Sequence, residues 1–263
     1  MKNQAYHAHP AISNSRLSRF LQSPRLTRVP LKPTPSLRWG SLVHTFLLEP
    51  HLVATDWAVM PEGLDKGKGA KERKEQFALE AVGKEVVKHE EYESLVAIRD
   101  AVFADEYAGA LLTEKGTRFE ESFFWHDSAS GFDLRCRPDF LRPDGILGDL
   151  KTTASVNPRK FASSFFDFGY HRQSAMYGDG IAENTGAHPT QTVFIAIQGD
   201  EAPEIFVQCF AVPASVIETG RVHYRKGLEQ MRMIRDKFGD DSSLWPTKLT
   251  DGIIDLEQPA YIR

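Results

Sequence analysis

The chain has 263 residues and a formal net charge of −4, and 41% of its residues are hydrophobic, enough for a sizeable core. This composition excludes a disordered chain and a polycationic packaging protein. No stretch approaches the roughly 20 apolar residues of a membrane span, and the first residues lack the apolar run of a secretory signal. The cysteines, Cys136 and Cys209, are too few for a disulfide framework or a four-cysteine metal site. We therefore expect a cytoplasmic protein with no membrane partner.

Basic residues are concentrated in two parts of the chain. No acidic residue precedes Glu49, and residues 151–175 hold four Lys or Arg against the single acid Asp167. Such separation can create a basic surface that attracts a polyanion, although a solvated surface with chance clustering explains the charges equally well. The basic residues that we consider as contacts to nucleic acid are Arg16, Arg19, Arg25, Arg159 and Lys160.

The first 50 residues are predicted to form a helical, basic part of the chain. Ser13 and Ser15 are typical of a helix start, and the helix that follows is stopped by Pro24. A second helix is predicted over residues 37–48 and ends before Pro50.

Residues 62–76 are rich in glycine and charge, which predicts a mobile loop that leads into a helix. Gly67-Lys68 does not belong to a nucleotide-binding P-loop, because no Ser or Thr follows the lysine and Glu62 stands where the first glycine would be. Further helices are predicted over residues 90–112.

Beyond residue 115 the hydrophobic pattern changes from helical to twofold, which predicts strands, and later segments alternate between helix and strand. The predicted fold is α/β, with a central mixed β-sheet flanked by helices. We expect a single domain over residues 1–263, in which residues 1–50 are the helical part and residues 115–240 the core. The predicted strands are Arg118–Trp125, Asp133–Arg137, Ile146–Leu150, Thr192–Gln198 and Ile205–Phe210, and the predicted helices are Pro158–Phe166, Tyr170–Glu183 and Pro213–Phe238.

The strongest chemical signal is Asp139 followed ten residues later by Asp149-Leu150-Lys151. Side chains alternate on a strand, so Asp149 and Lys151 project to one face while Leu150 enters the core. A short turn brings Asp139, at the end of the preceding strand, beside Asp149. Two carboxylates suit Mg²⁺, and the lysine could orient or deprotonate a water that attacks a phosphodiester. Strands that end in this way also occur by chance, so the pattern alone is moderately specific.

Four other residues are candidates for the same site. Glu121 lies one strand earlier and could supply a third carboxylate, with Glu120 facing the opposite side. His44 lies on the predicted second helix, where a lone histidine is usually a packing or capping residue. Gln173 and Tyr177 share a helix face and could hold a phosphate or stack on a sugar, although a buried tyrosine has the same spacing.

Together and in this order, these motifs resemble the PD-(D/E)xK nuclease superfamily, and more narrowly the C-terminal nuclease of exonuclease VIII (RecE) and its phage relatives. The opening Ile12-Ser13-Asn14-Ser15 and the helix ending Leu48-Glu49-Pro50 are also similar to that group. The resemblance implies a restriction-endonuclease-like core. The motifs that carry it are Gly40-x-x-x-His44, Glu121, Arg137-Pro138-Asp139, Asp149-Leu150-Lys151 and Gln173-x-x-x-Tyr177.

The resemblance implies an ATP-independent, Mg²⁺-dependent exodeoxyribonuclease that degrades linear double-stranded DNA from the 5′ end, for recombination by single-strand annealing. It implies two Mg²⁺ ions that Mn²⁺ can replace, a ring of three or four copies, and a RecT- or Beta-like annealing protein as partner. By position, Lys151 would be the base that orients the attacking water, and Arg137, Gln173 and Tyr177 would contact DNA. The implied metal ligands are Asp139, Asp149, Glu121, His44 and the Leu150 carbonyl.

Two other functions stay open at this point. A RecB-type or structure-specific DNA endonuclease carries the same metal motif, although no Walker motif of a fused helicase is found. A catalytically silent DNA-binding module would have no need to keep Asp139, Asp149 and Lys151 together. Digestion of linear against covalently closed circular DNA would separate these possibilities.

Overall fold

The computed structural model describes residues 3–29, 32–64, 66–199 and 204–250 of the chain. Its centre is a five-stranded mixed sheet in the order β3-β6-β7-β8-β9, in which β7 and β8 are parallel and the other neighbours antiparallel. The predicted α/β fold with a central mixed sheet is confirmed. The strands are β3 (Arg118–Phe119), β6 (Phe140–Leu141), β7 (Ile146–Thr152), β8 (Gln191–Gln198) and β9 (Phe206–Val212).

Strand β7 positions the candidate site, because it crosses the middle of the sheet and is covered on both faces. Leu150 and Ile195 are fully buried and pack with helices α3 (Pro35–Leu48), α6 (His89–Ala104) and α7 (Glu106–Thr113). Phe194, on the opposite face, packs with α8 (Pro158–Asp167). Burial of both faces is the usual situation of parallel neighbours in α/β proteins.

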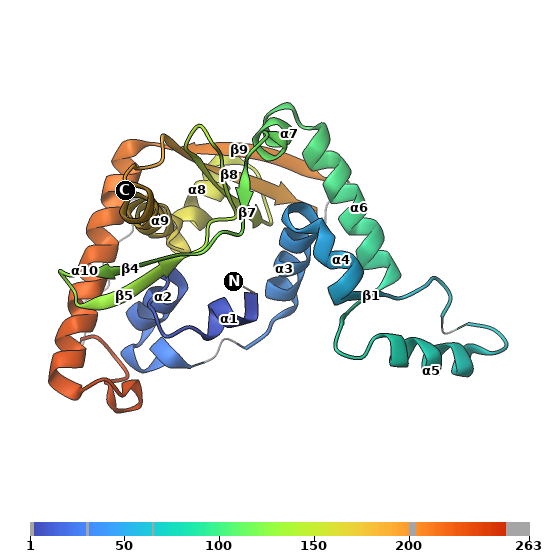
Figure 1. The fold of residues 1–263 in the computed structure, drawn as a ribbon, viewed down its shortest axis with the longest axis horizontal. Helices are drawn as coiled ribbons and strands as arrows, with labels where there is room; N and C mark the ends of the chain where they lie inside the picture. The colour runs from blue at the N-terminus through green and yellow to red at the C-terminus, as the bar shows by residue number, and fades with distance from the viewer. Residues whose placement is uncertain (1–2, 30–31, 65, 200–203, 251–263) are drawn as a thin grey trace.

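A second helical layer stands beside the sheet at the left of Figure 1. Helix α9 (Tyr170–Thr185) packs along α10 (Ala214–Phe238), and α2 (Asn14–Gln22) joins them through a buried cluster. Strands β4 (Phe123–Asp127) and β5 (Phe132–Cys136) form an antiparallel pair of their own next to this layer. The fully buried members of the cluster are Leu17, Phe20, Leu134, Ala175, Met176, Tyr224, Leu228 and Met231.

Shorter elements lie around this framework. Helix α1 (Asn3–Ala8) is close to β4 and β5, and α5 (Ala70–Glu80) projects from the right-hand side in Figure 1 with no buried residue. No helix of the described residues is long and apolar enough to cross a membrane. The remaining elements are α4 (Pro50–Asp56), the parallel pair β1 (Trp57–Val59) and β2 (Glu85–Val87), and the 3-10 helices η1 (Pro24–Arg28) and η2 (Ser242–Leu244).

The predicted strand Arg118–Trp125 differs from the structure. The chain leaves the central sheet after Phe119 and begins the separate β4–β5 pair at Phe123, with Glu120 in a left-handed conformation at the break. A twofold pattern shows which side chains alternate but does not reveal that a chain changes sheets. The predicted helical region 90–112 likewise divides into α6 and α7 at Asp105. The predicted domain extends to residue 263, but residues 251–263 lie outside the described part of the chain.

Candidate active site

Three side chains from distant parts of the sequence converge at one end of the central sheet. His44 comes from α3, Glu120 from the break after β3, and Asp139 from the residue before β6; one ligand atom of each lies within 4.8 Å of the others. The Nδ1 atom of His44 is 3.4 Å from Oδ2 of Asp139 and 4.0 Å from Oε1 of Glu120. Two carboxylates and an imidazole at such distances can hold a divalent cation.

The unusual backbone at Glu120 places this carboxylate. Its φ of 50° is in the left-handed region, which non-glycine residues adopt only when the surroundings require it, and such strain is concentrated at functional sites. The amide of Glu120 donates to the carbonyl of Asp139 at 3.1 Å, which holds the turn against the neighbouring strand.

The position expected for Glu121 is therefore taken by Glu120. Glu121 forms an ion pair with Arg118 at 2.7 Å and is 38% exposed, outside the cluster. Because the left-handed residue interrupts the alternation of side chains, the face of each glutamate cannot be counted from the strand. Glu49, at the end of α3, was also not predicted as a site residue, yet its charge contributes to the raised pKa of Glu120.

A close packing contact between β6 and β7 fixes Asp139 against the rest of the site. Phe140 pairs with Gly148 in the ladder, and its ring covers the glycine. A Cβ at position 148 would lie 1.8 Å from Cζ of Phe140, so only glycine allows this approach. Asp139, directly before Phe140, is thereby held next to the strand that carries Asp149 and Lys151.

Asp149, Lys151 and Gln173 form a second group on the same end of the sheet. Asp149 is 4% exposed; it forms an ion pair with the Lys151 ammonium and accepts a hydrogen bond from Nε2 of Gln173 at 2.5 Å. Lys151 also lies 4.8 Å from the ring centre of Tyr170, a favourable cation–π distance. The two side chains of β7 share a face, as strand alternation predicts.

The main chain of Leu150 links these two groups. Its N–H donates to Oδ2 of Asp139 at 2.5 Å, and its carbonyl lies 3.1 Å from Nε2 of His44. Since a carbonyl can only accept, Nε2 of His44 must carry the hydrogen. The other nitrogen, Nδ1, therefore faces the two carboxylates, the arrangement in which a neutral imidazole binds a metal. The Leu150 carbonyl, implied as a metal ligand, bonds His44 here.

The three side chains of the cluster shift one another's pKa values. Burial raises the pKa of Glu120 to about 8, and the charge of Asp139 adds to the effect. Burial would lower the pKa of His44, but the Asp139 carboxylate outweighs it and raises the pKa to about 9. The pKa of Asp139 is lowered, since the positive charge of His44 outweighs burial. Protons thus occupy the cluster near neutral pH, and a bound cation would replace them.

The second group keeps its lysine charged. Burial raises the pKa of Asp149 to about 6, with the charge of Asp139 as a further cause. Burial would lower the pKa of Lys151, but the charges of Asp149 and Asp139 outweigh it, so the pKa is raised. The raised pKa favours the ammonium form of Lys151, which can orient a water or offset negative charge.

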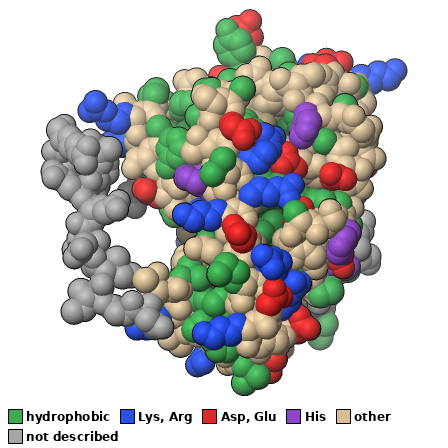
Figure 2. Space-filling model, turned by 90° about the vertical axis from the view of Figure 1, so that its left-hand side faces the viewer, with side chains coloured by type: hydrophobic (Ala, Val, Ile, Leu, Met, Phe, Trp, Pro, Cys, Tyr) green, Lys and Arg blue, Asp and Glu red, His purple; other side chains and the backbone are tan. Residues whose placement is uncertain are grey.

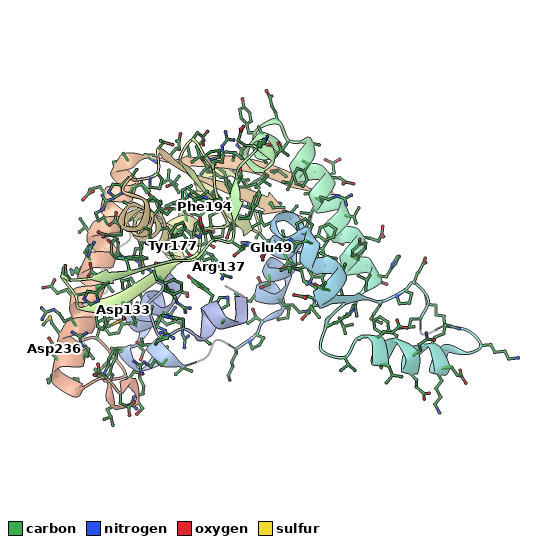
Figure 3. All side chains as sticks on the ribbon, viewed as in Figure 1. Glu49, Asp133, Arg137, Tyr177, Phe194 and Asp236 are labelled. Carbon is green, nitrogen blue, oxygen red and sulfur yellow. The ribbon has the colours of Figure 1, made fainter. Side chains whose placement is uncertain are left out.

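Arg137 and Tyr177 lie next to the site, and in Figure 3 they appear in the same central region as Glu49, while Asp236 lies far to the left. Nε of Arg137 donates to the Ser122 hydroxyl at 2.8 Å. Tyr177 is half-buried, and burial raises its pKa well above the usual value.

The other basic candidates are spread over the molecule. Arg16 donates to the carbonyls of Pro10 and Ala11, and Nε of Arg25 donates to the Trp245 carbonyl at 3.0 Å. These bonds use part of each guanidinium for internal contacts. The remaining candidates are Arg19, which is half-buried on α2, and Arg159 and Lys160, which are exposed in the first turn of α8.

The face on which α10 lies is not a basic surface. Figure 2 shows basic and acidic side chains interspersed on this side of the molecule. Several are paired, including Arg225 with Asp127 and Arg221 with Asp179. Because these charges are paired, this face offers little net positive charge to a polyanion.

Comparisons with known proteins agree with this architecture. A crystal structure from Eubacterium rectale, named "Putative exonuclease", has a TM-score of 0.64 at 14% identity and covers 100% of this chain and 96% of its own. An alkaline exonuclease from Laribacter hongkongensis has 17% identity over 75% of this chain and 97% of its own, with a TM-score of only 0.28. No curated protein sequence matches the chain.

At these identities the first structure shows a shared fold, and the second carries no argument. Residues 18–241 match the family model described as a PDDEXK-like domain of unknown function. That range includes His44, Glu120, Asp139, Asp149 and Lys151, and the superfamily recognised from the sequence is confirmed. The chain therefore belongs to the PDDEXK-like family.

Proposed function

We propose that this chain is a metal-dependent, ATP-independent exodeoxyribonuclease that degrades linear double-stranded DNA. The observation that carries the proposal is the convergence of His44, Glu120 and Asp139 beside the Asp149–Lys151 pair, joined through one peptide of β7. Membership of the PDDEXK-like family and the exonuclease named among the structures of the same fold support it.

In this proposal the metal is held by His44, Glu120 and Asp139. The donor set accepts Mg²⁺ through its oxygens, while the imidazole also suits Mn²⁺. A divalent cation bound there would supply positive charge that stabilises a phosphodiester under attack. A second ion, as the resemblance implies, would need Asp149 as a ligand, and Asp149 is held in place by Lys151 and Gln173.

The chain's own residues then have separate roles. The ammonium of Lys151 orients a water and offsets the negative charge that develops on the phosphate. Gln173 fixes the Asp149 carboxylate by its hydrogen bond, and Arg137 and Tyr177 border the path of the strand. Further phosphate contacts come from the exposed basic residues Arg159 and Lys160 and from the N-terminal arginines Arg16, Arg19 and Arg25.

The finer features of the proposal rest on the sequence resemblance. They are 5′-to-3′ direction, a ring of three or four copies, a single-strand annealing protein as partner, and a role in recombination in the cytoplasm.

The test is digestion of linear and covalently closed circular duplex DNA with and without Mg²⁺, using Asp139→Asn as the inactive control. We expect linear DNA to be shortened from the 5′ end, circles to stay intact, and the variant to be inactive. Rapid nicking of circles would indicate an endonuclease. Binding of DNA ends with no cleavage in Mg²⁺ or Mn²⁺ would indicate a silent module and would contradict the proposal.

A further inference from the structure

Helix α1 covers two arginines beside the candidate active site. The guanidinium groups of Arg135 and Arg137 lie 4.3 Å and 4.4 Å from the centre of the Tyr6 ring, and Tyr6 is 5% exposed. The ring of His9 lies 4.6 Å from that of Phe124. In Figure 1, α1 occupies the space between α2 and α3, below β4 and β5.

Arg135 is buried without an anion. It is 3% exposed, and the one hydrogen bond of its guanidinium among the described residues is from Nη2 to the His7 carbonyl, at 3.4 Å. Its Nε and Nη1 have no hydrogen-bond partner there, and no carboxylate of the described chain forms an ion pair with it. Burying a charge without a paired anion is costly, so a state in which an anion binds Arg135 would be favoured over this one.

The arginines are close to the metal cluster. Arg137 is two residues before Asp139, and Tyr6 is near enough to Glu120 for the charge of that carboxylate to contribute to the raised pKa of Tyr6, after burial as the main cause. A strand whose scissile phosphate lies at His44 and Asp139 would therefore bring neighbouring phosphates to the arginines that Tyr6 now covers.

We propose that α1 is a displaceable cover: in the free protein Tyr6 occupies the place of a DNA phosphate at Arg135 and Arg137, and an entering strand displaces Tyr6 together with α1. This inference rests on the proposed nuclease function. It assigns Arg135, which the sequence did not single out, to the path of the strand.

Replacement of the Tyr6 ring by a DNA phosphate at the two arginines is favourable on physical grounds. A phosphate offers a full negative charge and paired acceptor oxygens to a guanidinium, whereas an aromatic ring offers only its quadrupole. Helix α1 has six residues, too few to be stable once detached from the body. The ring contacts that join this segment to β4 and β5 are those of Tyr6 on the helix and of His9 just after it, and these are the contacts that displacement would break.

The direct test is hydrogen–deuterium exchange of wild-type protein in EDTA, with and without a short duplex whose binding is first measured by fluorescence anisotropy. We expect amides 5–8 to exchange faster when DNA is bound, while those of α5 (Ala70–Glu80) do not change. Slower or unchanged exchange of amides 5–8 in the complex would contradict the proposal that α1 is a displaceable cover. If the duplex does not bind, with or without Ca²⁺, both the proposed function and the cover are contradicted. If the duplex binds and the exchange of amides 5–8 does not rise, only the cover is contradicted.

A matched pair of variants tests the role of the ring. Tyr6→Ala removes both cation–π contacts, whereas Tyr6→Phe keeps the ring and removes a hydroxyl for which no hydrogen bond to a described residue is found. We expect Tyr6→Ala to bind the duplex about fivefold more tightly, because a smaller fraction of the molecules has Arg135 and Arg137 covered. We expect Tyr6→Phe to match wild type. Weaker binding by a folded Tyr6→Ala would mean that Tyr6 contacts DNA and would refute the cover. If Tyr6→Ala does not fold, the exchange experiment on wild type decides.

Discussion

Exchange of Glu120 for glutamine removes one of the three groups that converge at the metal cluster while preserving shape. A glutamine cannot supply the negative charge that a divalent cation requires, and even residues that only support a metal ligand change metal affinity by about 10- to 100-fold. We expect Glu120→Gln to lose at least about 100-fold in Mn²⁺ affinity and about 10²–10³ in the rate of DNA cleavage. Glu121→Gln, which breaks only the exposed pair with Arg118, should leave both unchanged.

The same variant should stabilise the metal-free protein at alkaline pH. The pKa of Glu120 is raised from 4.5 to about 8 by burial and by the charge of Asp139, so its carboxylate opposes folding increasingly as pH rises from about 4.5 to 8. At about 1.4 kcal/mol for each pKa unit, the upper limit is about 5 kcal/mol, and we expect a gain of about 1–3 kcal/mol at pH 8. Near pH 4 the two proteins should be equally stable.

Three measurements check this reasoning. Isothermal titration with Mn²⁺ gives the affinity, single-turnover digestion of linear duplex gives the rate, and urea unfolding in EDTA at pH 4 and pH 8 gives the stability. Loss of metal binding in Glu121→Gln with retention in Glu120→Gln would refute the placement of the left-handed turn. A Glu120→Gln protein that is less stable than wild type at pH 8 without metal would refute the electrostatic account of the cluster.

Three further outcomes are expected. Lys151→Ala should still bind Mn²⁺ and DNA ends but digest linear duplex at least about 100-fold more slowly in single-turnover assays, since an electrostatic contact to the reacting phosphate is lost; undiminished cleavage would remove Lys151 from the mechanism. Mn²⁺ affinity should fall about tenfold or more for each pH unit between pH 9 and pH 7, because protons on His44 and Glu120 compete with the cation, and a flat titration profile would contradict their role as ligands. Neutralising Arg16, Arg19 and Arg25 together should flatten the salt dependence of DNA binding by roughly one log–log unit for each lost phosphate contact; an unchanged slope would leave these arginines as internal anchors.

Because β7 is a regular strand, the relative positions of Asp149 and Lys151 could be predicted from the sequence. Strand β7 pairs along its whole length with β8, so alternation places Asp149 and Lys151 on one face and Leu150 in the core. Helical spacing likewise places Gln173 and Tyr177 on one face of α9, and Gln173 reaches Asp149.

Other parts depend on contacts between distant segments, which local patterns do not encode. Glu120 enters the cluster because the backbone turns left-handed as the chain changes sheets, and neighbouring glutamates offer no sequence signal to choose between them. The position of α1 follows from the contact of Tyr6 with arginines about 130 residues away. That contact becomes visible only once β5 is placed beside the N-terminal helix.

The peptide of Leu150 gives this enzyme fold an unusual kind of mutational robustness. Its N–H and C=O hold Asp139 and His44, while its side chain is fully buried among the helices. A substitution at position 150 by any residue except proline, which has no N–H, therefore keeps both groups and can affect the candidate metal cluster only by shifting the strand. Core packing thus decides which apolar side chains are tolerated at this position. A variant whose side chain fits the core keeps the geometry of the cluster, because the main chain makes both hydrogen bonds.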